Sequence, residues 1–167
     1  MNIRFEKSSD IEKINKVNLE AFETAAEAKL INALRNAKIE LISLVADVDS
    51  EIVGHILFSP VTINDHIETK IAGLAPMSIL PAWQNQGIGT QLVKEGLIAC
   101  SQAGYDAVAV LGHPNYYPRF GFTPSVNYGI KSEYDVPEDV FMLLELKKDA
   151  LKNITGTIKY HSIFNEM

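Results

Sequence analysis

The chain has 167 residues, of which 47% are hydrophobic and 22% charged, and its formal net charge is -6. This size and composition indicate one folded domain with a sizeable core, and exclude a disordered, collagen-like or coiled-coil chain. The negative charge argues against a protein that wraps nucleic acid, which usually has a basic face, and slightly favours a cationic substrate.

The N-terminal part predicts one strand and two helices. Apolar and polar residues alternate over Asn2 to Glu6, as expected of a strand. Ser9 and Glu12 have the spacing of a capping box, which predicts that a helix begins there. A second helix is expected over about Ala25 to Ala37, where apolar residues recur at helical spacing.

The middle of the chain predicts a hairpin and a third strand. Strands over Leu41 to Asp47 and Glu51 to Val61 flank a polar turn and would pair as a hairpin. The next strand is expected over Glu68 to Leu80, where Gly73 and Pro76 interrupt the pattern. A proline within a strand pattern indicates a bulge or an edge.

The C-terminal half begins with a glycine-containing loop that opens an amphipathic helix ending at Gly104. The expected elements that follow the loop are a helix over Gly87 to Ala103, a buried strand over Ala107 to Leu111, a helical turn over Asn115 to Phe120, a long loop over Thr123 to Pro137, and strands over Val140 to Leu146 and Thr157 to Ile163. This order predicts an α/β fold of the α+β kind, in which helices flank a mixed, mostly antiparallel central sheet with one helical crossover.

The single cysteine, Cys100, excludes an internal disulfide and a cysteine-type metal site, so we expect no metal and a reducing, cytoplasmic environment. Residues 1 to 10 lack the apolar core of a signal peptide. No apolar run approaches the roughly 20 residues that span a bilayer. We therefore expect no membrane partner and no nucleic-acid partner.

The segment LAPMSILPAWQNQGIGTQLV, residues 74 to 93, combines a strand, a turn and a helix start with two glycines. The first amides of a helix have no partner within it, and glycines let a ligand approach them, so an anion such as a phosphate can bind there. No Gly-Lys-Ser/Thr follows, and Gln86 and Gln91 stand where a dinucleotide-binding loop needs glycines. A Q-x-x-G-x-G turn remains.

A second segment, VLGHPNYYPRFGF at residues 110 to 122, places Tyr117 four residues before the glycine of the pair Gly121-Phe122. Together the two motifs resemble the GNAT family of N-acetyltransferases over essentially the whole chain, and in particular a bacterial, YhbS-like branch. The resemblance implies one N-acetyltransferase domain over residues 1 to 167. It also implies a splayed pair of parallel strands, ending near Leu80 and Leu111, that holds the cofactor.

The resemblance further implies acetyl-coenzyme A as co-substrate and direct attack on it by a primary amine in a ternary complex. A backbone N–H near Met77 or Ser78 would stabilise the developing oxyanion. Tyr117 is the expected general acid for the departing thiolate, unless it only packs against the cofactor or the core. The residues expected to bind the cofactor through their backbone are Met77, Ser78, Ile79, Gln84, Asn85, Gln86, Gly87, Ile88, Gly89 and Thr90.

The sequence does not identify a general base. The polar candidates are His55, His66, Glu68 and His113, and a water chain could replace any of them. His113 follows the strand nearest to the expected site and is the most interesting of the four. Cys100 lies on the apolar face of its helix, so a small core residue is its expected role.

Other functions stay open at this point. The chain could be a non-catalytic acyl-coenzyme A sensor or regulatory module, a transferase for another acyl chain, or an unrelated phosphate binder. The acceptor could be a small molecule, a peptide N-terminus or a protein lysine. Acidic residues of the long loop could attract a cationic amine: Glu133, Asp135, Glu138 and Asp139. The last strand could pair between subunits in a homodimer.

Overall fold

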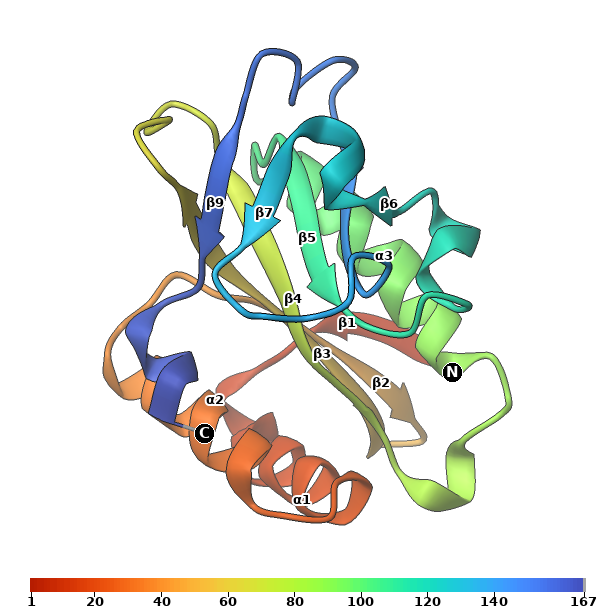
Figure 1. Cartoon of the computed structure of the whole chain (residues 1–167). Helices are drawn as coiled ribbons and strands as arrows, with labels where there is room; N and C mark the ends of the chain where they lie inside the picture. The colour runs from red at the N-terminus through yellow and green to blue at the C-terminus, as the bar shows by residue number, and fades with distance from the viewer. Residues whose placement is uncertain (167) are drawn as a thin grey trace.

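The computed structural model describes residues 1–166 and has one central sheet with helices on both of its faces (Figure 1). Its three α-helices are α1 (Ile11–Ala21), α2 (Ala26–Asn36) and α3 (Ile88–Gln102). Its strands are β1 (Asn2–Phe5), β2 (Ile42–Val48), β3 (Glu51–Ile63), β4 (Ile71–Ile79), β5 (Ala107–Leu111), β6 (Thr123–Pro124), β7 (Ile130–Ser132), β8 (Phe141–Glu145) and β9 (Gly156–Lys159).

The strands follow the order β1-β2-β3-β4-β5-β8-β6, and β9 pairs with both β3 and β7. Only the β4-β5 and β7-β9 pairs are parallel among the strands described. The expected mixed, mostly antiparallel sheet is therefore confirmed, with α3 as the crossover between the parallel strands β4 and β5.

Alternation along β3 produces the two packed faces of the sheet. Ile56 and Phe58 belong to the same buried cluster as Leu92 of α3. Leu57, which lies between them in the chain, packs on the opposite face with Leu34 of α2. Figure 1 shows α1 and α2 side by side, in the red and orange part of the chain. The sheet thus separates α3 from the α1–α2 pair.

Strands β4 and β5 part before β4 ends. Their pairing runs only from Ile71 opposite Ala107 to Leu74 opposite Val110. On the other side of β4, the register against β3 shifts, so that two β4 residues, Ala75 and Pro76, lie opposite one β3 residue. The bulge expected from the proline is confirmed, and proline has no N–H to continue a ladder. Beyond Leu74, β4 has no strand partner on the β5 side among the residues described.

Two expected boundaries near the N-terminus and in the centre are wrong. The first α-helix begins at Ile11 instead of Ser9, and a 3-10 turn over Ser8–Asp10 leads into it. In this turn the Asp10 carboxylate accepts hydrogen bonds from the Lys7 backbone N–H and the Arg4 guanidinium, each at 2.7 Å. The capping box of Ser9 and Glu12 therefore does not form. Strand β4 begins at Ile71 instead of Glu68, which lies in the preceding turn. Just before the strand, the Lys70 N–H donates a hydrogen bond to the Asp106 carboxylate at 2.8 Å.

The expected loop over residues 123–137 contains the short strands β6 and β7. Their partners, β8 and β9, lie later in the chain, so local sequence pattern carries little trace of them. The last expected strand ends at Lys159, and Ser162–Glu166 forms a 3-10 turn instead. Within residues 1–166, no helix is both long and apolar enough to cross a lipid bilayer.

A buried histidine makes folding sensitive to pH. His55 on β3 is 0% exposed, with Nε2 2.8 Å from the Ser43 hydroxyl and Nδ1 3.4 Å from the Asn18 amide. Burial lowers the pKa of His55 from its ordinary 6.5 to about 3. The ring is therefore neutral in the folded protein at any pH near neutrality.

We predict that the contribution of His55 to the free energy of unfolding falls by about 2 kcal/mol between about pH 7 and about pH 5. Over this range His55 binds a proton in the unfolded chain but stays neutral in the folded protein. The contribution is complete above the unfolded pKa and is lost as the pH falls toward the folded one. Urea titrations of the wild type and of His55→Gln, which keeps a polar group but cannot titrate, measure it. Identical pH dependences in the two proteins would contradict the assignment.

Candidate active site

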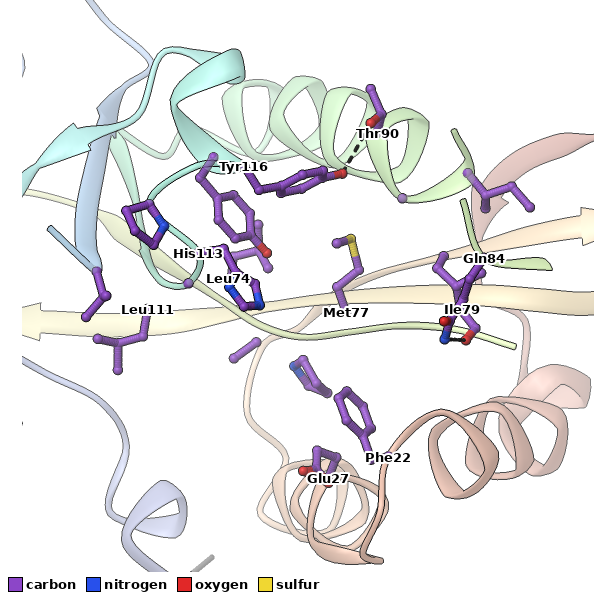
Figure 2. Close-up of a pocket in the computed structure, with 18 of the residues that line it drawn as sticks. Phe22, Glu27, Leu74, Met77, Ile79, Gln84, Thr90, Leu111, His113 and Tyr116 are labelled. Atoms are coloured by element: carbon purple, nitrogen blue, oxygen red, sulfur yellow. Dashed lines mark hydrogen bonds between the residues drawn. The ribbon is translucent and has the colours of Figure 1, made fainter. Parts of the chain in front are cut away.

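One cavity of about 1420 Å³ passes through the place where β4 and β5 part (Figure 2). Its walls come from β4, the start of α3, the segment after β5, the end of α1, the first part of α2 and the C-terminal segments. Sites for one small ligand usually measure roughly 300–1,000 Å³. The cavity is therefore larger than a site for one small ligand usually is.

The first end of the cavity lies at the start of α3. Gly87 caps this helix with a φ of 84°, and no atom lies within 4 Å of the place where a side chain would begin. No side chain caps the helix, and the first hydrogen bond into it is from the Gln91 N–H to the Gly87 carbonyl. The N–H groups of Ile88, Gly89 and Thr90 therefore have no partner in the helix and can receive an anion.

The unpaired edge of β4 forms the middle of the cavity. The Leu80 N–H donates to the Val53 carbonyl at 2.8 Å, and this bond sets the phase of the antiparallel ladder with β3. Backbone groups alternate in direction along such a ladder, so Ser78 faces β3 while Met77 and Ile79 face the gap. The Gln84 side-chain amide donates a hydrogen bond to the Ile79 carbonyl at 3.1 Å, so this carbonyl is already paired. The Met77 N–H and carbonyl and the Ile79 N–H then face the cavity.

Two adjacent tyrosines differ in surroundings. Tyr117 is 8% exposed, packs its ring on Gly112 so closely that a Cβ there would overlap it, and makes an edge-to-face contact of 5.1 Å with Tyr116. The Tyr116 hydroxyl lies 3.2 Å from the Thr90 hydroxyl, which ties the segment after β5 to α3 (Figure 2). Burial raises the pKa of Tyr117 to about 12, so its hydroxyl stays protonated and can donate a hydrogen bond.

The cavity is electrically polarised. Arg119 is the sole lysine or arginine in its wall among residues 1–166, and its guanidinium lies 4.3 Å from the centre of the Tyr116 ring, near α3. Glu27 of α2 is the sole acidic residue in the wall over the same part of the chain. Figure 2 shows Glu27 beside Phe22, across β4 from Tyr116 and Thr90. Positive and negative charge therefore mark opposite ends.

The structure brings together most of the residues expected at the site. Met77, Ile79, Gln84, Asn85, Gly87, Ile88, Gly89, Thr90 and Tyr117 all line the cavity. Two expected residues do not. Ser78 is 3% exposed and pairs with His55 across the β3-β4 ladder. Gln86 is exposed and donates its side-chain amide to the Ala82 carbonyl at 3.4 Å.

Of the four candidate bases, only His113 lies in the cavity wall among the residues described. His55 is sealed inside the sheet, and the exposed His66 has Nε2 3.1 Å from the Thr155 carbonyl. Cys100 is 0% exposed, and burial raises the pKa of its thiol to about 12, in agreement with a core role. The four acidic residues of the long loop, Glu133, Asp135, Glu138 and Asp139, lie outside the cavity wall. The Glu133 carboxylate instead accepts a hydrogen bond from the Tyr160 backbone N–H at 3.1 Å.

Sequence reasoning missed both charged wall residues, although one signal was present. Glu27, Ile31 and Leu34 have the i, i+4, i+7 spacing of one helix face, and the two apolar residues are buried. An acid in an apolar stripe is unusual and indicates a ligand or a partner. Arg119 has no comparable signal, because its place depends on how the segment after β5 folds.

The amino-acid sequence matches proteins of a known family. Residues 40–124 match the family described as acetyltransferase (GNAT) domain. Over 166 residues the chain is 36% identical to the uncharacterized N-acetyltransferase YhbS of Escherichia coli K12, and the match covers 99% of each chain.

Two solved structures of GNAT acetyltransferases match the fold of this chain over nearly its whole length. The crystal structure of the GNAT family N-acetyltransferase YhbS from Escherichia coli in complex with CoA matches with a TM-score of 0.93 and 35% identity, covering 98% of this chain and 91% of that one. A GNAT family acetyltransferase from Brucella melitensis in complex with acetyl-CoA matches with a TM-score of 0.79 and 34% identity, covering 98% and 97%. The chain is thus an acetyltransferase that belongs to the GNAT family.

Proposed function

We propose that this protein transfers the acetyl group of acetyl-coenzyme A to a primary amine by direct attack in a ternary complex. The observation that carries the proposal is the single cavity that joins the uncapped start of α3, the open edge of β4 and the opposite face of the sheet. The relatives from Escherichia coli and Brucella melitensis, which were crystallised with CoA and acetyl-CoA, support the identity of the co-substrate.

The chain's own groups fit such a co-substrate. The amides of Ile88, Gly89 and Thr90 would bind the pyrophosphate at the positive end of the α3 dipole. Arg119 at the same end of the cavity would add a counter-charge for phosphate. The Met77 and Ile79 backbone would pair with the amide-containing arm of the cofactor, much as an added β-strand does.

In the transfer itself, the neutral amine nitrogen attacks the thioester carbonyl, the carbon–sulfur bond breaks, and the sulfur leaves as thiolate. The nitrogen loses one proton to solvent water as the amide forms. The Met77 N–H faces the gap and would stabilise the negative charge that develops on the carbonyl oxygen. Tyr117 would donate its hydroxyl hydrogen toward the sulfur as charge accumulates there. Its pKa of about 12 exceeds the roughly 8.5 of an ordinary thiol, so hydrogen bonding contributes more than full proton transfer.

Direct attack is favoured because the cavity wall contains no cysteine, serine or lysine among residues 1–166. Neither Cys100 nor Ser78 lines the cavity. The alternative of a binding module without turnover has no feature of the described residues in its favour. Acetylation of an amine panel separates the two functions.

Gly89→Glu should weaken acetyl-coenzyme A binding at least about tenfold, because a carboxylate would stand among the amides that bind the pyrophosphate. Gly89 has a helical backbone, so this change avoids the strain that Gly87, with its φ of 84°, would introduce. Calorimetric titration measures the dissociation constant.

Gln102→Glu is the matched control, since it adds the same charge at an exposed position at the far end of α3. It should bind acetyl-coenzyme A like the wild type. Wild-type affinity in folded Gly89→Glu would sink the proposed phosphate site, and a folded wild type that does not bind acetyl-coenzyme A would sink the proposed function.

Tyr117→Phe should lower kcat about 100-fold while the dissociation constant of acetyl-coenzyme A changes less than about threefold, because the ring packing stays and only the hydroxyl is lost. Tyr116→Phe removes a hydroxyl from the neighbouring ring and should keep kcat within about threefold. Steady-state assays measure kcat, and calorimetric titration measures the dissociation constant of acetyl-coenzyme A. A kcat of Tyr117→Phe within about threefold of the wild-type value would show that the Tyr117 hydroxyl takes no part in the chemistry.

A further inference from the structure

The half of the cavity that lies across β4 from α3 has an apolar and aromatic lining. Tyr134, Tyr160 and Phe164 form an aromatic wall, in which the ring centres of Tyr160 lie 5.9 Å from Tyr134 and 5.1 Å from Phe164. Phe22, at the end of α1, and Leu30 of α2 complete this side. Such a surface binds a flat or bulky apolar group by burial and ring contacts.

One ionisable group interrupts this lining. Glu27 lies in the first turn of α2, where the helix dipole favours its negative charge. Its Oε2 atom is buried and has no hydrogen-bond partner, and its carboxylate makes no ion pair with any residue from 1 to 166. A buried carboxylate oxygen without a donor is costly, so a ligand donor is the natural partner.

The charged residues of the cavity wall favour a ligand with one positive charge over a ligand with several. Arg119 stands at the opposite end, beside Tyr116 and the start of α3, so it does not neutralise Glu27. A ligand with one ammonium group would pair with Glu27, and its apolar body would lie on the aromatic wall. A ligand with several charges would bring further ammonium groups against apolar side chains, with no second carboxylate among the described wall residues to receive them.

We propose that Glu27 binds the ammonium group of the acceptor, and that the acceptor is a singly charged primary amine with an aromatic or bulky apolar body. This inference rests on the proposed function, because it places the acceptor in the half of the cavity that the co-substrate leaves open. The apolar wall then holds the body of the acceptor. Before the attack the ammonium group gives one proton to the Glu27 carboxylate, and the neutral amine nitrogen then moves to the thioester carbonyl in the gap beside Met77.

The test compares Glu27→Gln with Glu23→Gln. Both changes remove one negative charge and keep the size of the side chain, but Glu23 is exposed and lies outside the cavity wall. The probes are 2-phenylethylamine, ethylamine and spermidine, which share a primary amine and differ in apolar body and charge. Two quantities are measured: the kinetic constants of acetylation, and calorimetric binding of each amine to the protein saturated with CoA, which needs no turnover.

The wild type should use 2-phenylethylamine with the highest kcat/KM of the three. Glu27→Gln should raise its KM and its dissociation constant at least about tenfold, as expected when a hydrogen bond to a charged group is lost. Glu23→Gln should leave both within about twofold. Binding of acetyl-coenzyme A should be the same in all three proteins.

The outcomes separate this inference from the function on which it rests. A wild type that does not bind acetyl-coenzyme A defeats the proposed function. A wild type that binds it and acetylates amines, but prefers spermidine or ethylamine, overturns the acceptor class. Equal amine affinity in Glu27→Gln and Glu23→Gln overturns the role of Glu27.

Discussion

The parting of β4 from β5 after Leu74 is the constraint on which the site depends. A parallel pair that stayed together to the end of β4 would use its backbone groups within the sheet and close the passage between the two faces. The bulge at Ala75 and Pro76 and the early end of β5 at Leu111 prevent this. The backbone of Met77 and Ile79 is then available to a ligand, which would satisfy groups that the sheet leaves open.

The second consequence of the split is a cavity with two chemically different ends. At one end, helix amides without partners and Arg119 create a positive site next to polar side chains. At the other end, Glu27 is a single negative charge within an aromatic lining. Tyr117 lines the same cavity, and its hydroxyl is protonated because burial raises its pKa. Such a gradient would orient two substrates whose reacting groups must meet in the middle.

Local patterns in the sequence predicted those parts of the structure that depend on local physics. The turn before α3, the helix itself and the buried strand β5 follow from glycine placement and apolar periodicity, and all three are confirmed. The short strands β6 and β7 were missed because distant partners stabilise them. Glu27 was missed for a related reason, since its importance depends on C-terminal aromatic residues far away in the chain.

The most direct test of this account is amide hydrogen exchange in ¹⁵N-labelled protein, measured by NMR with and without saturating acetyl-coenzyme A. The account predicts that exchange slows at the Met77 and Ile79 amides, which face the gap. It should not change at Ser78, whose amide already faces β3. Unchanged exchange at Met77 and Ile79 under saturation would contradict the claim that the open edge of β4 receives the co-substrate.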